Sequence, residues 1–290
     1  MKPARFDYDA PTSLDEALGL LADHGEEAKV LAGGQSLVPL LNFRLARPDR
    51  LIDLNGVDEL AYVRADGSLR IGAMTRQAAL ERADAAAAWP LLGQALHWVG
   101  HFQIRNRGTV GGSVAHADPA AELPVACTAL DATMHVHSRQ GARSVAARDF
   151  FVTHLTTTIE PDELLVELEL PPLPPGTGTA FEEYARRHGD FALGGAAAVV
   201  TLDGSGTCTA ARIALLGAAP TPLRASEAEA ALVGVRVDEA AAQEVERRVS
   251  AAISPTGDIH GSADYRRGLV GALARRAVLA AAARAKGGAA

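Results

Sequence analysis

Two glycine-rich turns are the features of this sequence best suited to chemistry. Ala32-Gly33-Gly34-Gln35-Ser36 leaves a predicted strand and enters a predicted helix, and Gly108-Thr109-Val110-Gly111-Gly112-Ser113 follows later in the chain. Glycine pairs let backbone N–H groups approach an anion without a Cβ atom in the way, and the following helix N-terminus adds partial positive charge. One such turn is most often only a tight turn. Two of them, each followed by a hydroxyl residue, favour a site for a diphosphate.

The common nucleotide and hydrolase motifs are absent. Neither turn matches Gly-x-Gly-x-x-Gly or Gly-x4-Gly-Lys-[Ser/Thr], so a Rossmann dinucleotide site and a P-loop are both disfavoured. Ser36 and Ser113 do not lie in a Gly-x-Ser-x-Gly sequence, so a serine-hydrolase nucleophile is not supported.

The histidines and carboxylates form no recognisable metal or acid–base motif. His97 and His101 are four residues apart near the end of a predicted helix, and His135 and His137 share one face of a predicted strand. No third ligand is near either pair in sequence, so we expect no metal site. The carboxylates in glycine-, histidine- or arginine-rich surroundings are interpreted as caps and ion-pair partners: Asp118, Glu122, Asp190 and Asp264.

Composition narrows the class of protein. With 290 residues, 48% of them hydrophobic and 22% charged, the chain can form one large soluble domain or two modest ones. Its net charge of −7 lacks the positive field that nucleic acid or an anionic membrane requires, so neither is an expected partner. No leader-like or membrane-spanning apolar stretch is present in the sequence, so we expect no membrane span.

The two cysteines also restrict the chemistry. Cys127 and Cys208 form neither a disulfide framework nor a Cys-x-x-Cys pair, which favours a reducing cytoplasm. Two thiolates cannot hold an iron–sulfur cluster on their own. Any cluster that this protein works with must therefore lie on another chain.

The chain divides into three segments that must position the turns. The first resembles a compact parallel α/β unit, with a helix over 14–23 that starts at a capping box, strands over 29–32 and 50–54, and a helix over 37–43 between them. The second is expected to form a mixed sheet with helices. Its predicted features are a hairpin at Asp66-Gly67, a helix capped by Thr75, a helix over 91–99, a loop over 105–113, and strands over 133–137 and 164–170.

A proline-rich stretch marks the best domain boundary. Residues 171–178 cannot continue a central strand and are stiff. Beyond them the pattern predicts a small sheet of three strands, helices that start near three positions, and a frayed tail over 286–290. The strands are expected over 180–185, 192–202 and 208–216, and the helices from about 224, 238 and 264.

Four motifs together resemble a known family. Residues 31–39, followed by 47–54, resemble the first FAD motif of the medium, flavin-binding subunit of the molybdenum hydroxylases, the carbon monoxide dehydrogenase and xanthine dehydrogenase family. Residues 103–124, 186–192 and 260–267 agree with further motifs of that family in order and spacing. The resemblance therefore covers nearly the whole chain.

The resemblance implies an α+β fold in two domains. Residues 1–175 would form an FAD-binding domain of the vanillyl-alcohol-oxidase/PCMH type, with subdomains of about 1–56 and 57–175. Residues 176–290 would form a C-terminal domain of three-stranded antiparallel sheet plus helices. FAD would lie extended between these parts.

The resemblance also implies the residues that bind FAD. Glu122 matches an aspartate that relatives use on the polyol chain, Leu165 or its neighbour Leu164 matches a backbone contact to the isoalloxazine edge, and Asp190 and Phe191 would lie near the ring. Residues matching those on the diphosphate are Ala32, Gly33, Gly34, Gln35, Ser36, Thr109, Gly111, Gly112 and Ser113.

The function implied is electron transfer. Electrons would pass from 2Fe-2S centres on a small iron–sulfur subunit to FAD on this chain and then to an external acceptor, while a large subunit with the molybdopterin cofactor oxidises the substrate. A dimer of heterotrimers is the implied assembly, and this chain would need no catalytic nucleophile of its own. Glu182 stands where animal xanthine dehydrogenases carry a lysine, which puts NAD as acceptor in doubt. The alternatives are a stand-alone FAD-dependent oxidase or monooxygenase on the same fold, and a scaffold that has lost its flavin.

Overall fold

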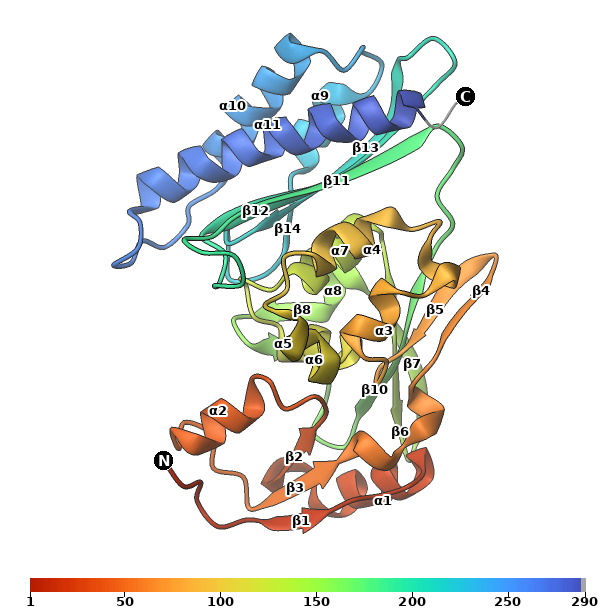
Figure 1. Ribbon diagram of the computed structural model, residues 1–290, viewed down its shortest axis with the longest axis vertical. Helices are drawn as coiled ribbons and strands as arrows, with labels where there is room; N and C mark the ends of the chain where they lie inside the picture. The colour runs from red at the N-terminus through yellow and green to blue at the C-terminus, as the bar shows by residue number, and fades with distance from the viewer. Residues whose placement is uncertain (288–290) are drawn as a thin grey trace.

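Three main β-sheets follow one another along the molecule in chain order, as Figure 1 shows. The structure is a computed structural model, and it describes residues 1–287. The N-terminal sheet lies at one end, a central sheet with its helices lies in the middle, and the C-terminal sheet lies at the other end (Figure 1).

The N-terminal sheet is parallel, as the sequence predicts. Its strands have the order β1-β3-β2: β1 (Asp7–Asp9), β2 (Ala28–Leu31) and β3 (Arg50–Asp53). Helix α1 (Leu14–His24) has Ser13 as its N-cap, whose side chain accepts a hydrogen bond from the Glu16 N–H, so the predicted helix start is confirmed; the Glu16 carboxylate accepts from the Thr12 N–H. Strand β1 was not predicted, because Asp-Tyr-Asp carries no apolar pattern. Its backbone pairs with β3, and its side chains also contact Arg50 and Asp53 of that strand.

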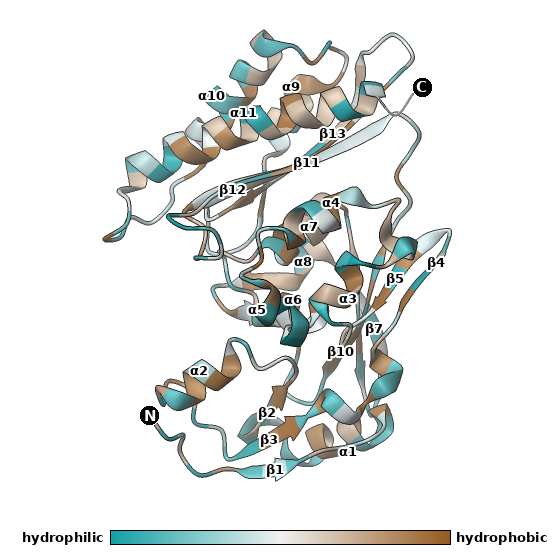
Figure 2. Ribbon diagram, viewed as in Figure 1, coloured by the Kyte–Doolittle hydropathy of each residue, from teal (hydrophilic) through white to brown (hydrophobic). Residues whose placement is uncertain are grey.

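Helix α2 (Leu37–Asn42) connects β2 to β3 and is unusually exposed for an apolar helix. Figure 2 shows it mainly in the hydrophobic colours. Val38, together with Phe43 and Leu45 just after the helix, is exposed to solvent. Contiguous exposed apolar residues of this kind are characteristic of surfaces that another molecule covers.

The central sheet has five strands in the order β4-β5-β10-β6-β7. They are β4 (Val63–Asp66), β5 (Ser68–Gly72), β6 (Thr133–Ser138), β7 (Gly141–Ala146) and β10 (Leu164–Leu170). Every neighbouring pair is antiparallel, so the expectation of a mixed sheet is wrong. The remaining elements of this part are α3 (Gln77–Glu81), α4 (Pro90–Leu96), α5 (Phe102–Arg107), α6 (Val110–His116), α7 (Glu122–Ala129), α8 (Ala147–Phe150), β8 (Phe151–Thr153) and β9 (Thr156–Thr157).

Two local predictions in this part are wrong. Thr75 does not cap a helix, because its hydroxyl donates to the Tyr62 carbonyl at 2.7 Å, and α3 begins only after Arg76. The predicted loop over 105–113 is mostly helical, since α5 and α6 are separated only by Gly108 and Thr109. The glycines conceal α6 at the sequence level because glycine is a poor helix former, and here tertiary packing overrides that propensity.

The C-terminal sheet is antiparallel and has the order β11-β12-β13-β14. Its strands are β11 (Thr177–Tyr184), β12 (Gly194–Leu202), β13 (Cys208–Leu216) and β14 (Leu223–Arg224). The two-residue strand β14 makes this sheet four-stranded instead of the predicted three, because the chain pairs with β13 just before the next helix.

Three helices complete the C-terminal part: α9 (Ser226–Leu232), α10 (Glu239–Ala252) and α11 (Ala263–Gly287). Helix α11 lies across one face of β11 and β12, and α10 packs against α11 (Figure 1). The tail predicted to fray begins inside α11, which continues through Gly287, so that prediction is wrong for Lys286 and Gly287. Its remaining residues, 288–290, lie outside the described part of the chain.

The other face of the C-terminal sheet joins the central core. Phe181, Ala197 and Val199 are buried in one cluster with residues of α4 and α7. Outside that cluster, the carboxylate of Asp131 accepts from Arg212 at 2.8 Å and from Arg224 at 2.7 Å, which ties the end of α7 to β13 and β14. In residues 1–287, no helix has the length and apolar character needed to cross a membrane.

Candidate functional site

The two glycine turns lie side by side in the structure. About 75 residues separate them in the sequence, a length that would span roughly 250 Å if the chain were fully extended. A Cβ atom built on Gly33 would lie 2.7 Å from the Cα atom of Gly108. A Cβ atom on Gly112 would lie 3.3 Å from the Cβ atom of Ala32. The close approach needs glycine at Gly33, because any side chain there would push the segments apart.

The first turn presents a row of free backbone donors. Among the described residues, none accepts a hydrogen bond from the N–H groups of Gly33, Gly34, Gln35 or Ser36. Gly34 adopts a positive φ of 73°, which glycine accommodates without strain. Successive N–H groups in such a turn form a concave site for an anion.

A cavity of about 360 Å³ opens in front of this turn. Asp53, Asn55 and Arg107 line it together with the turn, so it contains a cation, a carboxylate and a neutral amide, and the Asp53 carboxylate accepts hydrogen bonds from Tyr8 and the Asn55 N–H. Asn55 donates to the Ala32 carbonyl at 3.0 Å and accepts from Arg76 at 2.6 Å. Burial and the positive charge of Arg107 lower the pKa of Arg76.

Asn55, Arg76 and Arg107 were not predicted as site residues from the sequence. The position of Asn55 in the sequence could have indicated a site residue. Asn55 follows the end of β3, and the carboxyl ends of parallel strands meet at one edge of a sheet, where ligands commonly bind. Arg107 directly precedes Gly108 within the second motif. Arg76 carried no such signal, since its place depends on the tertiary contact of α3 with α5.

The second turn differs from the first in how its donors are used. The N–H of Gly111 donates to the Ala73 carbonyl at 2.9 Å, and those of Gly112 and Ser113 donate to Thr109. These bonds make Thr109 the N-cap of α6. The second turn therefore offers hydroxyl groups and close packing, while the first offers free N–H groups.

Leu165 lies on β10 beside the second turn. It is buried in the central core, at a point where the pairing of β10 with β6 shifts register. The carbonyl of the next residue, Val166, accepts from the Ala73 N–H at 2.9 Å, and Ala73 in turn accepts from Gly111. Strand β10 is thus tied to the second turn through Ala73.

Asp190 and Phe191 lie on the loop between β11 and β12. Phe191 is 78% exposed, and Asp190 forms a long ion pair of 3.9 Å with Arg186. Among the described residues, neither side chain forms a hydrogen bond or an ion pair with the glycine turns. The same loop does reach the start of α5, because a Cβ atom on Gly189 would lie 2.6 Å from the His101 ring.

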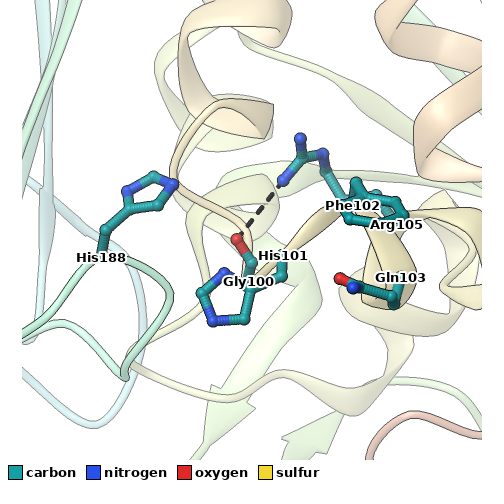
Figure 3. Close-up of a pocket in the computed structure, with 6 residues that line it drawn as sticks. All are labelled: Gly100, His101, Phe102, Gln103, Arg105 and His188. Carbon is teal, nitrogen blue, oxygen red and sulfur yellow. Dashed lines mark hydrogen bonds between the residues drawn. The ribbon is translucent and has the colours of Figure 1, made fainter.

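A second cavity, of about 410 Å³, lies between that loop and α5. Figure 3 shows His188 on one side of it, His101 beside Gly100, and Gln103 and Arg105 on the other side. Arg105 donates to the carbonyls of Val99 and Gly100, so its charge is engaged by the backbone of the cavity wall.

His97 and His101, predicted to lie near the end of a helix, stand between α4 and α5. Helix α4 ends before His97, and His101 precedes α5. Both instead face His188, with ring centroids 5.5 Å and 6.2 Å from it.

His135 is brought to two carboxylates that are distant in sequence. Its Nε2 atom lies 3.0 Å from Glu169 and 3.7 Å from Glu167. Arg70 lies within ion-pair distance of both carboxylates, and Tyr62 and Ser68 donate hydrogen bonds to them. The donors that a metal ion would use are therefore occupied by protein groups.

The geometry of the first cavity fits FAD. The free N–H groups of Gly33, Gly34 and Gln35 and the cationic residue Arg107 line it and suit a diphosphate, and the small residues of both turns leave room for its close approach.

Comparisons with known proteins agree with this fit. The family described as "FAD binding domain in molybdopterin dehydrogenase" matches residues 4–173, and the family described as "CO dehydrogenase flavoprotein C-terminal domain" matches residues 179–281. The chain is 46% identical to the 6-hydroxypseudooxynicotine dehydrogenase complex subunit alpha of Paenarthrobacter nicotinovorans, over 99% of this chain and 97% of that protein. It is 41% identical to the carbon monoxide dehydrogenase medium chain of Afipia carboxidovorans, over 99% of this chain and 100% of that protein.

A solved structure gives the same result. The fold matches a chain of the carbon monoxide dehydrogenase from Hydrogenophaga pseudoflava that lacks the Mo-pyranopterin moiety of its molybdenum cofactor, with a TM-score of 0.95 and 40% identity over 98% of this chain and 99% of that chain. An FAD-binding domain followed by a C-terminal domain is therefore the architecture, and the family consists of oxidoreductase subunits. This chain belongs to the FAD-binding medium subunits of the molybdenum hydroxylases, of the carbon monoxide dehydrogenase and xanthine dehydrogenase type.

Proposed function

We propose that this chain is the FAD-carrying electron-transfer subunit of a molybdenum-containing hydroxylase. It takes electrons from 2Fe-2S centres on a small partner subunit and passes them to an external acceptor, while a large subunit with the molybdopterin cofactor oxidises the substrate. The observation that carries this proposal is the row of free N–H groups from Gly33 to Ser36 beside Arg107.

The chain's own residues bind and orient the cofactor, and FAD supplies the redox chemistry when bound. The N–H groups after β2 and the Arg107 guanidinium hold the diphosphate. Thr109 and Ser113 add hydroxyl groups, and Gly111 and Gly112 allow the second turn to pack closely.

The remaining predicted residues act along the rest of FAD. Glu122 would accept hydrogen bonds from the polyol chain, and the backbone at Leu165 would contact the edge of the isoalloxazine ring. Asp190 and Phe191 lie near the ring, and the exposure of Phe191 leaves its aromatic face available. The site needs no nucleophile or acid–base pair of its own in this proposal.

The domain limits belong to the same proposal. The FAD-binding domain spans residues 1–175, in subdomains of about 1–56 and 57–175, with the arrangement of the vanillyl-alcohol-oxidase/PCMH type, and the C-terminal domain spans 176–290. The family matches over 4–173 and 179–281 support this division.

Three observations support partner subunits. The relatives are described as a complex subunit and a medium chain, and they match over their full length, which favours a subunit over a stand-alone oxidase. Both cysteines are buried and therefore unavailable to a cluster. The exposed apolar residues Val38, Phe43 and Leu45 offer a surface for a partner. The assembly would be a dimer of heterotrimers.

A charge-removing variant tests the diphosphate site. Arg107→Gln should weaken FAD binding about tenfold, because one charge-assisted contact to the diphosphate is lost. Arg148→Gln is the matched control, since Arg148 is 79% exposed and its ion pair within residues 1–287 is with its neighbour Asp149. Fluorescence titration of flavin-free protein with FAD measures both. Equal affinities of the two variants and the wild type would contradict the proposed diphosphate site.

Metal analysis of the complex purified through a tag on this chain tests the partner subunits. The proposal requires iron and molybdenum to co-purify with FAD. Turnover of an organic substrate by this chain without iron or molybdenum would instead establish the stand-alone enzyme.

A further inference from the structure

The side chain of Asn55 bonds to the backbone just before the first glycine turn. The parallel register of β2 and β3 pairs Leu31 with Asp53, so both strands end at the same edge of the sheet. Asn55 follows Asp53 by two residues, in a short 3₁₀ helix over Leu54–Gly56. The Asp53 side chain caps this helix by accepting from the Asn55 N–H at 2.9 Å. The local fold of the sheet edge therefore holds Asn55 beside Ala32, to which it donates a hydrogen bond.

The bond from Asn55 fixes a peptide group whose N–H is one of the free donors of the first turn. The Asn55 Nδ2 atom donates to the Ala32 carbonyl at 3.0 Å. In a trans peptide the C=O of one residue and the N–H of the next lie in one plane and point in opposite directions. Gly33 lines the cavity, and its N–H has no acceptor among the described residues. A bond that holds the Ala32 carbonyl therefore also sets the direction of the Gly33 N–H.

The same amide is joined to the second glycine turn through Arg76. The Asn55 Oδ1 atom accepts from Arg76 at 2.6 Å, and Arg76 also donates to the Arg107 carbonyl. The backbone of Arg76 forms a β-bridge with Thr109, so its guanidinium extends from a residue that is itself paired with the second turn. A chain of hydrogen bonds thus joins the first turn to Arg107, which lines the same cavity.

The partners of this side chain require an amide. The Nδ2 atom also donates to the Asp53 carboxylate, so the nitrogen faces two acceptors and the oxygen faces the Arg76 donor. A carboxylate at Asn55 could donate to neither acceptor and would place a second negative charge beside Asp53. A hydrocarbon side chain would leave the Ala32 carbonyl without this donor, and an unpaired polar group in a partly buried site is costly.

We propose that Asn55 is a positioning residue for the diphosphate of FAD. It sets the direction of the Gly33 N–H through the Ala32 carbonyl, and through Arg76 it keeps the first turn in register with the Arg107 cation. Both Nδ2 hydrogens are used by protein acceptors, so Asn55 acts through the peptide that it holds and not as a donor to the anion. The statement about FAD rests on the function proposed above.

Crystal structures of flavin-free variants test the positioning without FAD. In Asn55→Ala the peptide between Ala32 and Gly33 should turn from its wild-type direction, because its carbonyl has lost its donor. Asn55→Asp should also turn it, because the new carboxylate repels the carbonyl oxygen. Asn42→Ala is the matched control, since Asn42 is the last residue of α2 and does not line the cavity. A wild-type peptide direction in both Asn55 variants would overturn the positioning role.

Titration of flavin-free protein with FAD and with ADP measures the effect on binding. ADP has the same diphosphate but lacks the flavin and the polyol chain, so a loss confined to the diphosphate donors weakens both ligands by the same factor. Asn55→Ala should raise both dissociation constants about tenfold, and Asn55→Asp should raise them further. Asn42→Ala should keep the wild-type values. Weaker FAD binding with unchanged ADP binding, as a general loosening of the domains would give, would contradict the proposal.

A double-mutant cycle tests the link to Arg107. Arg76→Lys keeps the positive charge, but an ammonium group does not reproduce the planar fork that reaches two acceptors. In the Arg76→Lys background, Asn55→Ala should weaken FAD binding only about threefold, because part of its effect passes through Arg76. A full tenfold effect in that background would show that Asn55 does not couple the two turns.

The titrations also separate this inference from the function on which it rests. If the peptide turns in the Asn55 variants but no protein, the wild type included, binds FAD, the function proposed above fails while the orientation of the peptide by Asn55 stands. If the wild type and both Asn55 variants bind FAD equally well, the proposed function stands and the positioning role of Asn55 is overturned.

Discussion

A Cβ atom on Gly33 would lie 2.7 Å from the Cα atom of Gly108, so the first glycine turn and the start of the second are in direct contact. The contact sets the position of Arg107, whose carbonyl accepts a hydrogen bond from Arg76 and which lines the cavity before the first turn. One backbone contact thus brings the free N–H groups and the cation of the proposed diphosphate site together.

Gly33→Ala should separate the two turns and weaken FAD binding more than tenfold. The added methyl group cannot be accommodated, because the atoms that it meets belong to the backbone of Arg107 and Gly108. Gly204→Ala is the matched control, since a Cβ atom there meets nothing within 4 Å. FAD titration of both flavin-free variants measures the effect, and wild-type affinity in Gly33→Ala would show that the turns do not need this contact.

Thr109→Ala should lower the free energy of unfolding by about 1 kcal/mol, because the buried hydroxyl caps α6 by accepting from the Gly112 N–H at 3.1 Å. FAD binding should weaken as well, since the proposed site loses a hydroxyl. Thr109→Ser keeps the oxygen and should behave like the wild type in both respects. Denaturant unfolding and FAD titration provide the measurements, and equal behaviour of the alanine and serine variants would rule out a role for the hydroxyl.

Asp131→Asn should loosen the contact between α7 and the C-terminal sheet. Asparagine tolerates the positive φ of 52° at this position, so the change removes the ion pairs with Arg212 and Arg224 without adding strain. Because Asp131 is half exposed, the melting temperature should fall by only about 2 °C, and the difference from the wild type should shrink in high salt. Asp149→Asn, which affects only an exposed pair with Arg148, should leave the melting temperature unchanged. A salt-independent loss in Asp131→Asn would argue against an ionic contribution.

The sequence predicted those elements that are specified by residues close together in the chain. The capping box at Ser13 locates the start of α1, and the glycine pair after β2 locates the first turn. These signals depend on residues only a few positions apart. Helix α6 was not predicted from the sequence. Its glycines are held by contacts with Ala73 and Ala32, and no local pattern contains those contacts.

The part of the site that lies within one sequence motif was predicted from the sequence. The residues that only the tertiary fold brings to the site were not. The first turn was identified from its glycines and contains the free donors. Asn55 and Arg76 join it only through hydrogen bonds between segments distant in sequence.

The flavin content of this chain, purified together with whatever subunits accompany it, tests the central claim most directly. The visible spectrum and chromatography of the released cofactor should give one FAD per chain in the wild type and in Gly204→Ala, and little or none in Gly33→Ala. A colourless wild-type protein that also takes up no added FAD would contradict the account.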